Sequence, residues 1–506
     1  MQVGVALVVA MHGQMESAPR KAQHALYKAQ PRAQSRRRAP VVQDMADRPR
    51  PRKRRHFTAD SLGVVGEAAA ATERHGDKEQ RQPKTITIAH RHPFPRTSME
   101  TYLVGGAVRD ELLGRPVTDR DYVVVGATPQ EMLRLGFRQV GADFPVFLHP
   151  RTHCEYALAR TERKVAPGYR GFVVHAEPTV RLEEDLARRD LTINAMARAA
   201  DGTLIDPYGG LADLRSGILR HVSPAFREDP VRILRVARFA ARFGFQVAPP
   251  TLQLMREMVE AGEAAHLVAE RVFVELERAL CEPHPELFLD VLRQTGALRV
   301  QFPEIDRLFG IPQVARYHPE IDTGVHTRMT LMAACALSPE PRVRFAALVH
   351  DLGKGQTPPD QWPSHRAHEM RGVPLVAALC DRLRAPAEWR ALALAVTRYH
   401  LTVHRAMELK PLTIVRLIEA LDAIRRPRRW QEFLLACMAD ARGRLGCDQA
   451  PYPQADFLQA AQAACAAVSG AAFAKRGLQG RAIARRVRQA RVMAVAALAR
   501  PGPVGR

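Results

Sequence analysis

Hydrophobic and polar positions alternate in short runs along residues 99–206, which predicts short strands interspersed with short helices. An apolar run at Tyr102–Val104 stops at a glycine pair, and a helical pattern follows from Ala107 to Leu113. A second strand is predicted at Tyr122–Val125 because side chains alternate between the two faces of a strand. Further strands are predicted at Phe137–Val140, Val146–His149, Glu155–Leu158 and Leu204–Ile205.

Three longer segments of this region have distinct patterns. Thr161–His175, with Lys164 and several Pro and Gly residues, predicts a mobile basic loop. Leu186–Ala197 predicts a helix, in which residues 190 and 194 share one face. Phe226–Phe245 predicts a clear helix, capped by Asp229 ahead of a proline.

The predicted helix at 226–245 carries arginine at every third position on one side, at Arg232, Arg235 and Arg238. Such a face is either solvated or directed at an anion, and the pattern alone leaves both open. From about residue 247 onward the pattern is helical, with Pro and Gly turns. The sequence therefore predicts an α+β fold, in which a small mixed sheet with helices precedes an all-α remainder.

The composition of the chain indicates what kind of partner the protein binds. The 506 residues suffice for two to four domains, and the net charge of +22 implies an acidic partner such as RNA. Residues 1–98 supply half of that charge, lack a hydrophobic period and are predicted to be disordered. They are either a nucleic-acid-binding arm or precede the true start, and the position of Met99 directly before the first strand favours the second alternative. Cysteines without CxxC spacing predict a reduced, cytoplasmic protein, and we expect no membrane segment.

The turn after the first strand suits a phosphate. Gly105 and Gly106 let backbone N–H groups approach an anion at the start of a helix, and Arg109 lies one turn further on. Asp119 and Asp121 point to one face of the next strand, where they can share a divalent metal such as Mg²⁺. A phosphate cradle beside a carboxylate pair is typical of a nucleotidyl-transfer site.

Other charged groups are more ambiguous. Glu155 begins an alternating strand and is either a third metal carboxylate or an edge-strand charge. Arg188 and Arg189 either bind a triphosphate or pair with the carboxylates at 183–185. In the helical part, imidazoles and carboxylates that can ligate a transition metal occur at His326, His350, Asp351, His365, His368 and Asp440.

Taken together, these motifs resemble the bacterial class II tRNA nucleotidyltransferases, the CCA-adding enzymes, of the type with a C-terminal HD phosphohydrolase domain. The marks, in family order, are LVGGAVRD (103–110), DRD (119–121), RRDLTIN (188–194), EDPVR (228–232), RVARFAARF (235–243) and HDLGKG (350–355). The resemblance covers roughly four-fifths of the chain and excludes 1–98. It implies a nucleotidyltransferase head at 99–222, a helical neck at 223–315, an HD domain at 316–450 and a basic helical region at 451–506.

The resemblance also implies roles for matching residues. CTP or ATP would contact Gly106, Arg109, Arg189, Arg235 and Arg238. Asp119 and Asp121 would be catalytic and hold Mg²⁺, while Asp229 and Arg232 would read the base. The HD domain would bind Ni²⁺ or another transition metal through His326, His350, Asp351 and Asp440, with His365 and His368 nearby. Its implied activities are 2′,3′-cyclic phosphodiesterase, 2′-nucleotidase and phosphatase.

The template role has a physical basis. Cytosine and adenine both present an amino donor beside a ring-nitrogen acceptor, which match the carboxylate of Asp229 and the guanidinium of Arg232. Uracil and guanine invert that order. The implied partners are the acceptor arm and 3′ end of tRNA, bound by a monomer or homodimer. The alternatives are a poly(A) polymerase of the same superfamily, or an HD phosphohydrolase whose head only binds RNA.

Overall fold

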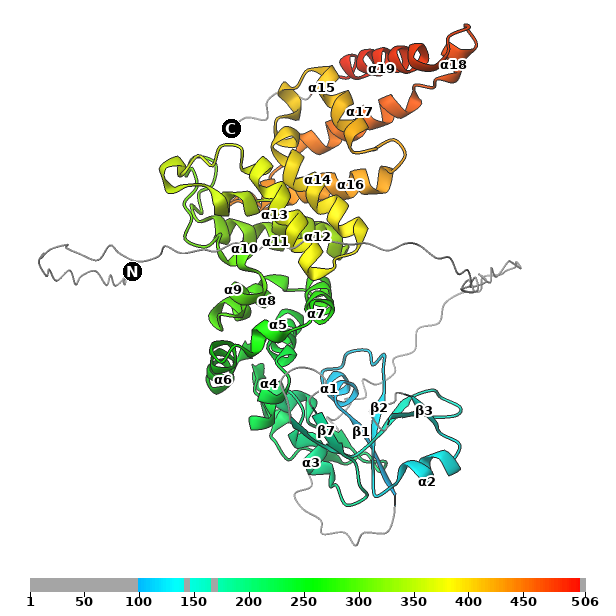
Figure 1. The fold of residues 1–506 in the computed structure, drawn as a ribbon, viewed down its shortest axis with the longest axis vertical. Helices are drawn as coiled ribbons and strands as arrows, with labels where there is room; N and C mark the ends of the chain where they lie inside the picture. The colour runs from blue at the N-terminus through cyan, green and yellow to red at the C-terminus, as the bar shows by residue number, and fades with distance from the viewer. Residues whose placement is uncertain (1–98, 141–145, 165–171, 501–506) are drawn as a thin grey trace, which may run out of the picture. The chain divides into compact units, whose positions relative to one another are not determined.

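The computed structural model describes residues 99–140, 146–164 and 172–500 (Figure 1). The predicted extension at 1–98 and the centre of the predicted basic loop, 165–171, lie outside these residues. The fold is 59% helical and 9% strand, with a mixed sheet in the N-terminal part and a helical remainder. The predicted α+β class is therefore confirmed.

The head is built on one sheet of seven strands, in the order β3-β4-β5-β2-β1-β8-β9. These strands are β1 (Glu100–Val104), β2 (Asp121–Val125), β3 (Arg138–Val140), β4 (Val146–Leu148), β5 (Glu155–Leu158), β8 (Ala197–Arg198) and β9 (Leu204–Ile205). The apolar residues of β1 and β2, such as Val104 and Val123, are buried, as the alternating pattern predicts.

The register of the central strands determines which polar residues meet. β1 and β2 are antiparallel, with Val104 opposite Asp121. β2 and β5 are parallel, with Asp121 beside Glu155. Only Gly105 separates β1 from α1 (Gly106–Leu112), so the glycine turn lies at the same end of the central strands as these carboxylates.

Two local predictions in the head are wrong. The segment predicted as a loop contains β6 (Thr161–Lys164) and β7 (Phe172–His175), which pair antiparallel. The predicted helix Leu186–Ala197 is not continuous, because α3 (Leu182–Ala187) ends early and only a 3₁₀ turn forms at Thr192–Asn194. Tertiary bonding overrides the helical pattern there, since the backbone of Thr192 donates to the Arg220 carbonyl.

The predicted helix at 226–245 begins later than expected. A 3₁₀ turn covers Pro224–Glu228, and α5 runs from Val231 to Phe243. Asp229 lies between the two and its Oδ1 accepts a bond of 3.1 Å from the Val231 amide, but the N-cap position belongs to Pro230, one residue later than predicted. Gly244, with φ of 71°, ends the helix in the left-handed conformation.

Apart from a short parallel pair, β10 (Ile218–Leu219) and β11 (Gln246–Val247), the rest of the described chain is helical or irregular. Besides α2 (Pro129–Arg134) and α4 (Gly210–Ser216) in the head, the helices are α6 (Pro249–Glu260), α7 (Ala269–Cys281), α8 (Pro285–Gln294), α9 (Ala297–Gln301), α10 (Pro303–Asp306), α11 (Thr323–Leu337), α12 (Pro341–Val349), α13 (His368–Leu383), α14 (Ala387–His404), α15 (Pro411–Ala420), α16 (Pro427–Arg442), α17 (Pro453–Ala467), α18 (Ala471–Ala474) and α19 (Gly480–Ala496). Most of these helices share one hydrophobic core, into which the apolar side of α5 packs. Ile233 and Val236 of α5 are fully buried there.

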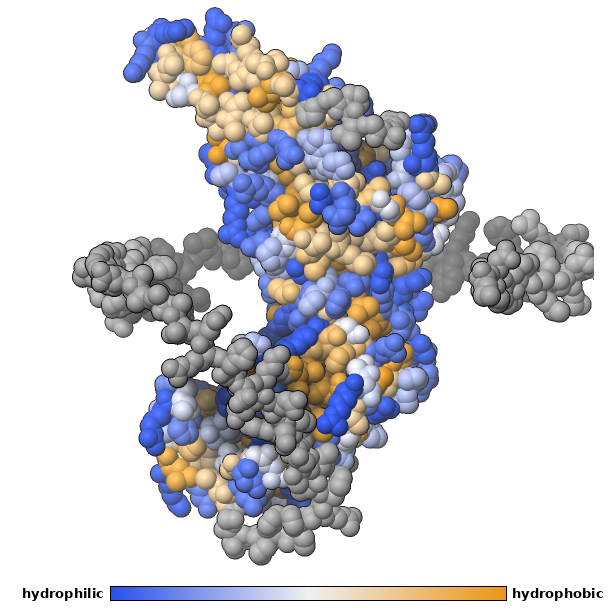
Figure 2. Space-filling view, turned by 180° about the vertical axis from the view of Figure 1, so that it is seen from behind, coloured by the Kyte–Doolittle hydropathy of each residue, from blue (hydrophilic) through white to orange (hydrophobic). Residues whose placement is uncertain are grey.

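One segment qualifies the expectation about membrane segments. By length and composition alone, Pro453–Ala474 is apolar enough to cross a membrane. It comprises α17 and α18, and Phe457, Leu458 and Cys465 of α17 are buried in the helical core. Figure 2 shows pale apolar surface interspersed with hydrophilic side chains at the end of the molecule that α17–α19 form. A single such segment is weak evidence for a membrane span.

Candidate active sites

The turn between β1 and α1 has no room for a side chain at its first glycine. Gly105 has φ of 68°, and a Cβ there would lie 2.9 Å from Nη1 of Arg189. Its carbonyl accepts from the Arg109 amide at 3.1 Å, which closes the first turn of α1. Gly106 follows as the first residue of the helix, and a Cβ at that position would meet only Arg109, at 3.5 Å. The backbone can thus approach an anion closely at this turn.

Three carboxylates lie at the end of the central strands beside this turn. Asp119, Asp121 and Glu155 are exposed, and the last two are register partners on adjacent parallel strands. Partial desolvation, with a further contribution from Asp119, raises the pKa of Asp121 above its ordinary value, while Arg189 acts in the opposite direction. Clustered carboxylate oxygens of this kind fit a hard divalent cation such as Mg²⁺. The register favours the reading of Glu155 as a third carboxylate of the cluster.

Arg188 and Arg189 follow α3 and share one buried carboxylate. Asp185 accepts from Arg188 Nη2 at 2.5 Å and from Arg189 Nη2 at 3.2 Å, and its side chain is fully buried. The pairing alternative is therefore realised for both arginines. Arg189 nevertheless keeps 20% of its side chain exposed, above Gly105 and close enough to Asp121 to affect its pKa.

Arg109 connects the head to α5 by its side chain. Its guanidinium donates to both oxygens of Asp110, at 2.9 and 3.0 Å, and to Oδ1 of Asn194 at 2.5 Å. Asp110 in turn accepts from Arg242 of α5 at 3.0 Å. The Arg109 guanidinium also lies over the ring of Phe239, and burial lowers its pKa. Arg109 is thus a buried link between α1 and α5 in this conformation.

The arginine side of α5 is paired rather than solvated. Arg235 contacts Oδ2 of Asp190 through Nε at 2.8 Å and Nη2 at 2.7 Å. Arg238 donates to Glu275 of α7 at 2.6 Å, and both side chains are buried. Although burial opposes ionisation of Asp190, Arg235 and the hydrogen bond from Asn194 hold its pKa well below the ordinary value. Ion pairs thus occupy two of the predicted nucleotide-binding arginines, whose role in binding stays a prediction.

The two predicted template residues lie one turn apart and are both engaged. Asp229 receives two hydrogen bonds from Arg271 of α7, at 3.2 and 2.8 Å. Arg232 donates to the carbonyls of Ala225 and Arg188, at 2.8 and 2.6 Å. Arg271 escaped the sequence analysis because a lone arginine on an amphipathic helix carries no local signal.

The four predicted HD ligands converge from α11, α16 and the end of α12. Asp440 Oδ1 lies 3.0 Å from His326 Nε2 and 3.6 Å from His350 Nε2. Asp351 Oδ2 lies 3.2 Å from His350 Nε2, and all four side chains are buried. Burial disfavours an imidazolium, yet Asp351 and Asp440 raise the pKa of His350 to about 10. Imidazole and carboxylate donors that converge in this way suit a metal ion of borderline softness.

Two further imidazoles approach the other oxygen of Asp351. His368 Nε2 lies 3.0 Å and His400 Nε2 lies 3.6 Å from Asp351 Oδ1. His368 was expected near the metal ligands, whereas His400 was missed. The H-x₃-H spacing of His400 and His404 on α14, which places both on one helical face, could have indicated them.

Outer residues orient the ligands. Glu320 Oε1 lies 2.9 Å from His326 Nδ1 and 3.0 Å from His318 Nδ1. On the opposite side, His404 Nε2 contacts Asp440 Oδ2 at 2.6 Å, and its Nδ1 lies 2.7 Å from the Tyr452 hydroxyl. A carboxylate behind a metal-binding imidazole fixes its tautomer and orientation.

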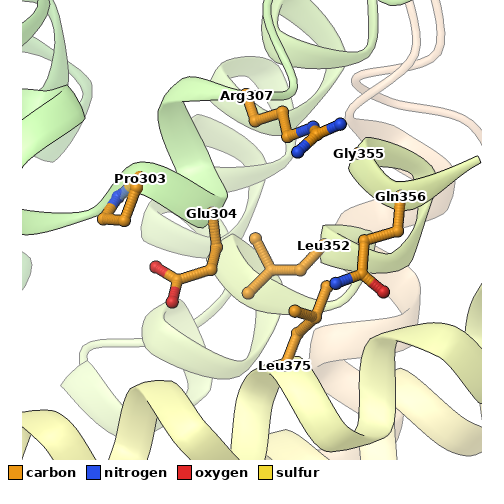
Figure 3. A pocket seen from close by; sticks show the side chains of 7 residues that line it. All are labelled: Pro303, Glu304, Arg307, Leu352, Gly355, Gln356 and Leu375. Atoms are coloured by element: carbon orange, nitrogen blue, oxygen red, sulfur yellow. The ribbon is translucent and has the colours of Figure 1, made fainter. Parts of the chain in front are cut away.

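His365 and a nearby pocket stand apart from these ligands. Nε2 of the His365 ring lies 2.8 Å from the Pro312 carbonyl oxygen. The backbone carbonyl oxygen of His365 lies 2.9 Å from Nδ1 of His368. A pocket of about 150 Å³ lies between α10, α13 and the turn after Asp351 (Figure 3). Its lining includes Glu304, Arg307 and Leu352 but none of the metal-facing side chains, and it is too small for a nucleotide.

Comparison with known proteins agrees with this division. Residues 101–220 match the poly A polymerase head domain, residues 244–309 match the probable RNA and SrmB-binding site of polymerase A, and residues 323–424 match the HD domain. The chain is thus an enzyme with a nucleotidyltransferase head and an HD domain. Members of both families depend on metals, and the groups of possible metal ligands in the HD part fit this dependence.

Two relatives are similar to this chain over most of its length. The chain is 64% identical to the multifunctional CCA protein of Thioalkalivibrio sulfidiphilus over 78% of its own length and 98% of that protein. It is 63% identical to the multifunctional CCA protein of Nitrosococcus oceani, with the same coverage. The chain therefore belongs to the multifunctional CCA protein family.

Solved structures share the fold at lower identity. A CCA-adding enzyme in apo form II has a TM-score of 0.55 and 21% identity, covering 80% of this chain and 89% of that one. The Thermotoga maritima CCA-adding enzyme, complexed with tRNA, has a TM-score of 0.53 and 21% identity with the same coverage. At this identity the likeness establishes the fold.

Proposed function

We propose that the head adds and repairs the 3′-terminal CCA of tRNA, using CTP and ATP without a nucleic-acid template. The observation that carries this proposal is the register that places Asp121 beside Glu155, with Asp119 two residues earlier, next to the glycine turn and Arg189. The relatives named multifunctional CCA proteins support it, as does the RNA-binding match at 244–309. Acting on tRNA, the enzyme would work in the cytoplasm.

In this reaction the tRNA 3′-hydroxyl attacks the α-phosphate of CTP or ATP, and pyrophosphate leaves. Asp119 and Asp121, with Glu155 beside them, would hold Mg²⁺. When bound, the ions would lower the pKa of the hydroxyl and neutralise charge on the phosphates. The backbone of the Gly105 turn and the exposed part of Arg189 would position the triphosphate.

Base selection would fall to Asp229 and Arg232. The carboxylate accepts from the amino group of cytosine or adenine, and the guanidinium donates to the ring nitrogen. A uracil or guanine leaves both groups unpaired, at about 1–3 kcal/mol each, so discrimination of about a hundredfold is expected. For Asp229 to read a base, the amino group must replace Arg271 at one of its oxygens.

The HD domain would hydrolyse phosphate esters, with 2′,3′-cyclic phosphodiesterase, 2′-nucleotidase and phosphatase activities. The cluster of His326, His350, Asp351 and Asp440 supports this part of the proposal, because imidazole and carboxylate donors suit Ni²⁺ and similar ions. Such a metal activates water or polarises the phosphate.

The test is incorporation on tRNA transcripts that end before CCA, after CC or after CCA, with each of the four NTPs alone and CTP plus ATP together. We expect growth to CCA followed by arrest, with UTP and GTP refused. A lengthening A tail would identify a poly(A) polymerase instead. Cyclic-phosphate hydrolysis without any incorporation would reduce the head to an RNA-binding module.

The variant Asp121→Ala tests the metal assignment in the head. It should abolish incorporation, because the carboxylate cluster loses its central member, while hydrolysis of a 2′,3′-cyclic nucleotide is retained. Retained incorporation would refute the metal assignment in the head.

A further inference from the structure

The last helix of the described chain, α19, belongs to a segment with an uneven charge balance. The 506 residues include 53 Asp or Glu, yet none of these occurs between residues 457 and 500, which hold eight Lys or Arg. Five of the eight are arginines of α19, at positions 481, 485, 486, 488 and 491. The helix lies outside the three regions that match family models. Neither of the two sites described above uses it.

One side of α19 is covered by its neighbours in the helical part. The helix packs against α15 and α17 (Figure 1). A Cβ at Gly470, which follows α17, would lie 3.3 Å from Ile483 and 3.7 Å from Val487. Val495 is buried in the core. The apolar side chains thus hold α19 in place, and the opposite side of the helix faces solvent.

Three arginines on the open side have no carboxylate partner. Arg481, Arg485 and Arg486 are exposed and form no ion pair among the residues that the structure describes. Arg486 donates to the neutral side chain of Gln489 at 3.2 Å. Because Arg481 and Arg485 lie one helical turn apart, their like charges repel each other. An anion bound to this side would relieve the repulsion.

The nearest carboxylate is already engaged on the flank of the helix. Glu419 of α15 pairs with Arg488 at 2.7 Å and lies 3.8 Å from Arg491. These two arginines therefore attach α19 to α15. The open side keeps its positive charge, which leaves it to a partner outside the described chain.

The composition of the open side favours RNA over a lipid surface. A helix that lies on a membrane exposes a broad apolar face beside its basic residues. On α19, Met493 is the one large apolar side chain that is strongly exposed, at 67%. Guanidinium groups, in contrast, bind phosphate oxygens through two parallel hydrogen bonds. A phosphate polyanion therefore fits this side of the helix.

The absence of aromatic residues indicates which form of RNA would bind. Single strands are bound largely by stacking of their bases on aromatic side chains. Residues 480–496 contain no Phe, Tyr, Trp or His, so α19 has no ring on which a base could stack. An RNA duplex is recognised instead through its phosphates and its shape.

We propose that Arg481, Arg485 and Arg486 bind the phosphate backbone of an RNA duplex. This contact is separate from the nucleotidyl-transfer site and reads no base sequence. The identity of the RNA rests on the proposed function, under which the duplex is a stem of the tRNA. The arginines hold this stem while the head acts on the 3′ end.

The test is the salt dependence of RNA binding by the full-length protein. Affinity for a tRNA transcript that lacks CCA is measured by filter binding from about 50 to about 300 mM KCl. The triple variant Arg481→Gln, Arg485→Gln, Arg486→Gln removes three phosphate contacts. The slope of log affinity against log salt concentration should therefore fall by about 3. Affinity near physiological salt should fall about tenfold or more.

The control changes the net charge equally at another surface. It combines Arg134→Gln, Arg138→Gln and Arg151→Gln, at exposed positions of the head, and should keep the slope of the wild type. Melting followed by circular dichroism shows whether both variants are folded. In steady-state incorporation, the α19 variant should have a higher KM for tRNA, with kcat and the KM for CTP unchanged.

An unchanged salt slope in the α19 variant would overturn the proposal, as would an equal loss in the control. Binding of an RNA duplex of about 16 base pairs should weaken together with tRNA binding, and a duplex that binds wild type and variant equally would exclude a stem as the ligand. Wild-type protein that sediments with phosphatidylglycerol vesicles, when the α19 variant does not and both bind RNA equally, would assign the surface to lipid. The binding assay needs no turnover, so the two proposals can fail separately. A reduced slope in a protein that adds no nucleotide would keep the RNA surface and refute CCA addition.

Discussion

The substitution Asp190→Asn tests the joint between the head and α5. It keeps the shape of the side chain but removes the charge that Arg235 contacts through Nε and Nη2. An amide oxygen can still accept from the Leu191 backbone, which the carboxylate now does at 2.8 Å. The variant therefore isolates the ion pair from the local turn.

The size of the effect follows from burial. Breaking a fully buried ion pair costs about 3–5 kcal/mol, whereas an exposed pair contributes about 0–1 kcal/mol. The Asp190 side chain is 7% exposed and that of Arg235 is 34% exposed. Because Arg235 can partly rehydrate, we expect a loss of about 2 kcal/mol, which is about a 30-fold change in the opening equilibrium of the joint.

The assay must report on this joint alone. All three tryptophans, Trp362, Trp389 and Trp430, lie in the helical HD part, so fluorescence does not monitor the head. Hydrogen exchange with mass spectrometry on peptides from α1 and α5 does, since local opening sets the exchange of their amides. The exposed carboxylate variant Asp201→Asn is the control and should change neither region.

The pH dependence gives a second check with a definite sign. The folded-state pKa of Asp190 lies below its unfolded value, so its contribution is complete above about pH 4 and is lost as the pH falls through the folded-state pKa. The difference between wild type and variant should therefore be constant from pH 6 to 8. Exchange in α5 that changes less than threefold at pH 7 would refute the claim that this pair stabilises the joint.

Two further substitutions address the edges of the sites. Gly105→Ala should raise the KM for CTP and ATP about tenfold or more, because the left-handed backbone disfavours alanine by about 1–2 kcal/mol and the new Cβ would lie 2.9 Å from Arg189. Steady-state incorporation kinetics measure the KM, and the control is Gly114→Ala, which also has a positive φ but open space around it. An unchanged KM would contradict the prediction. Glu320→Gln should lower the metal affinity of the HD domain about 10–100-fold, because His326 loses the carboxylate that orients it. Competition with a chelating dye measures this affinity. An unchanged affinity would show that Glu320 does not orient His326.

The sequence predicted the site where the chemistry is local and missed it where partners are distant. The glycine turn and the carboxylates 119 and 121 lie within one short unit, so spacing alone placed them together. Glu155 could not be assigned, because its position beside Asp121 depends on the parallel register of β2 and β5. His400, 49 residues after Asp351, joins the HD cluster through the packing of α14 against α12, which Asp351 follows.

The errors have the same origin. The segment Leu186–Ala197 has a helical pattern, yet Thr192 bonds to the Arg220 carbonyl and the chain straightens after Ala187. The arginines of α5 read as a face that is either solvated or anion-binding, because neither Asp190 nor Glu275 is near them in sequence. Partners far along the chain decide whether an arginine is exposed, and a single sequence does not contain that information.

Burial now ranks the arginines by how readily each can turn toward a nucleotide. Arg238 is 8% exposed and paired with a carboxylate that is itself buried, so moving it would leave a buried charge uncompensated. Arg271 and Asp229 are 32% and 25% exposed, and a pair of that kind contributes little, so separating the two side chains costs little free energy. Arg189 is 20% exposed and close enough to Asp121 to lower its pKa, so its guanidinium already lies near the carboxylates. Arg235 and Arg242 thus hold the joint between α5 and the head, Arg238 connects α5 to α7, and the more exposed pairs of Arg189 and Arg271 cost less to rearrange.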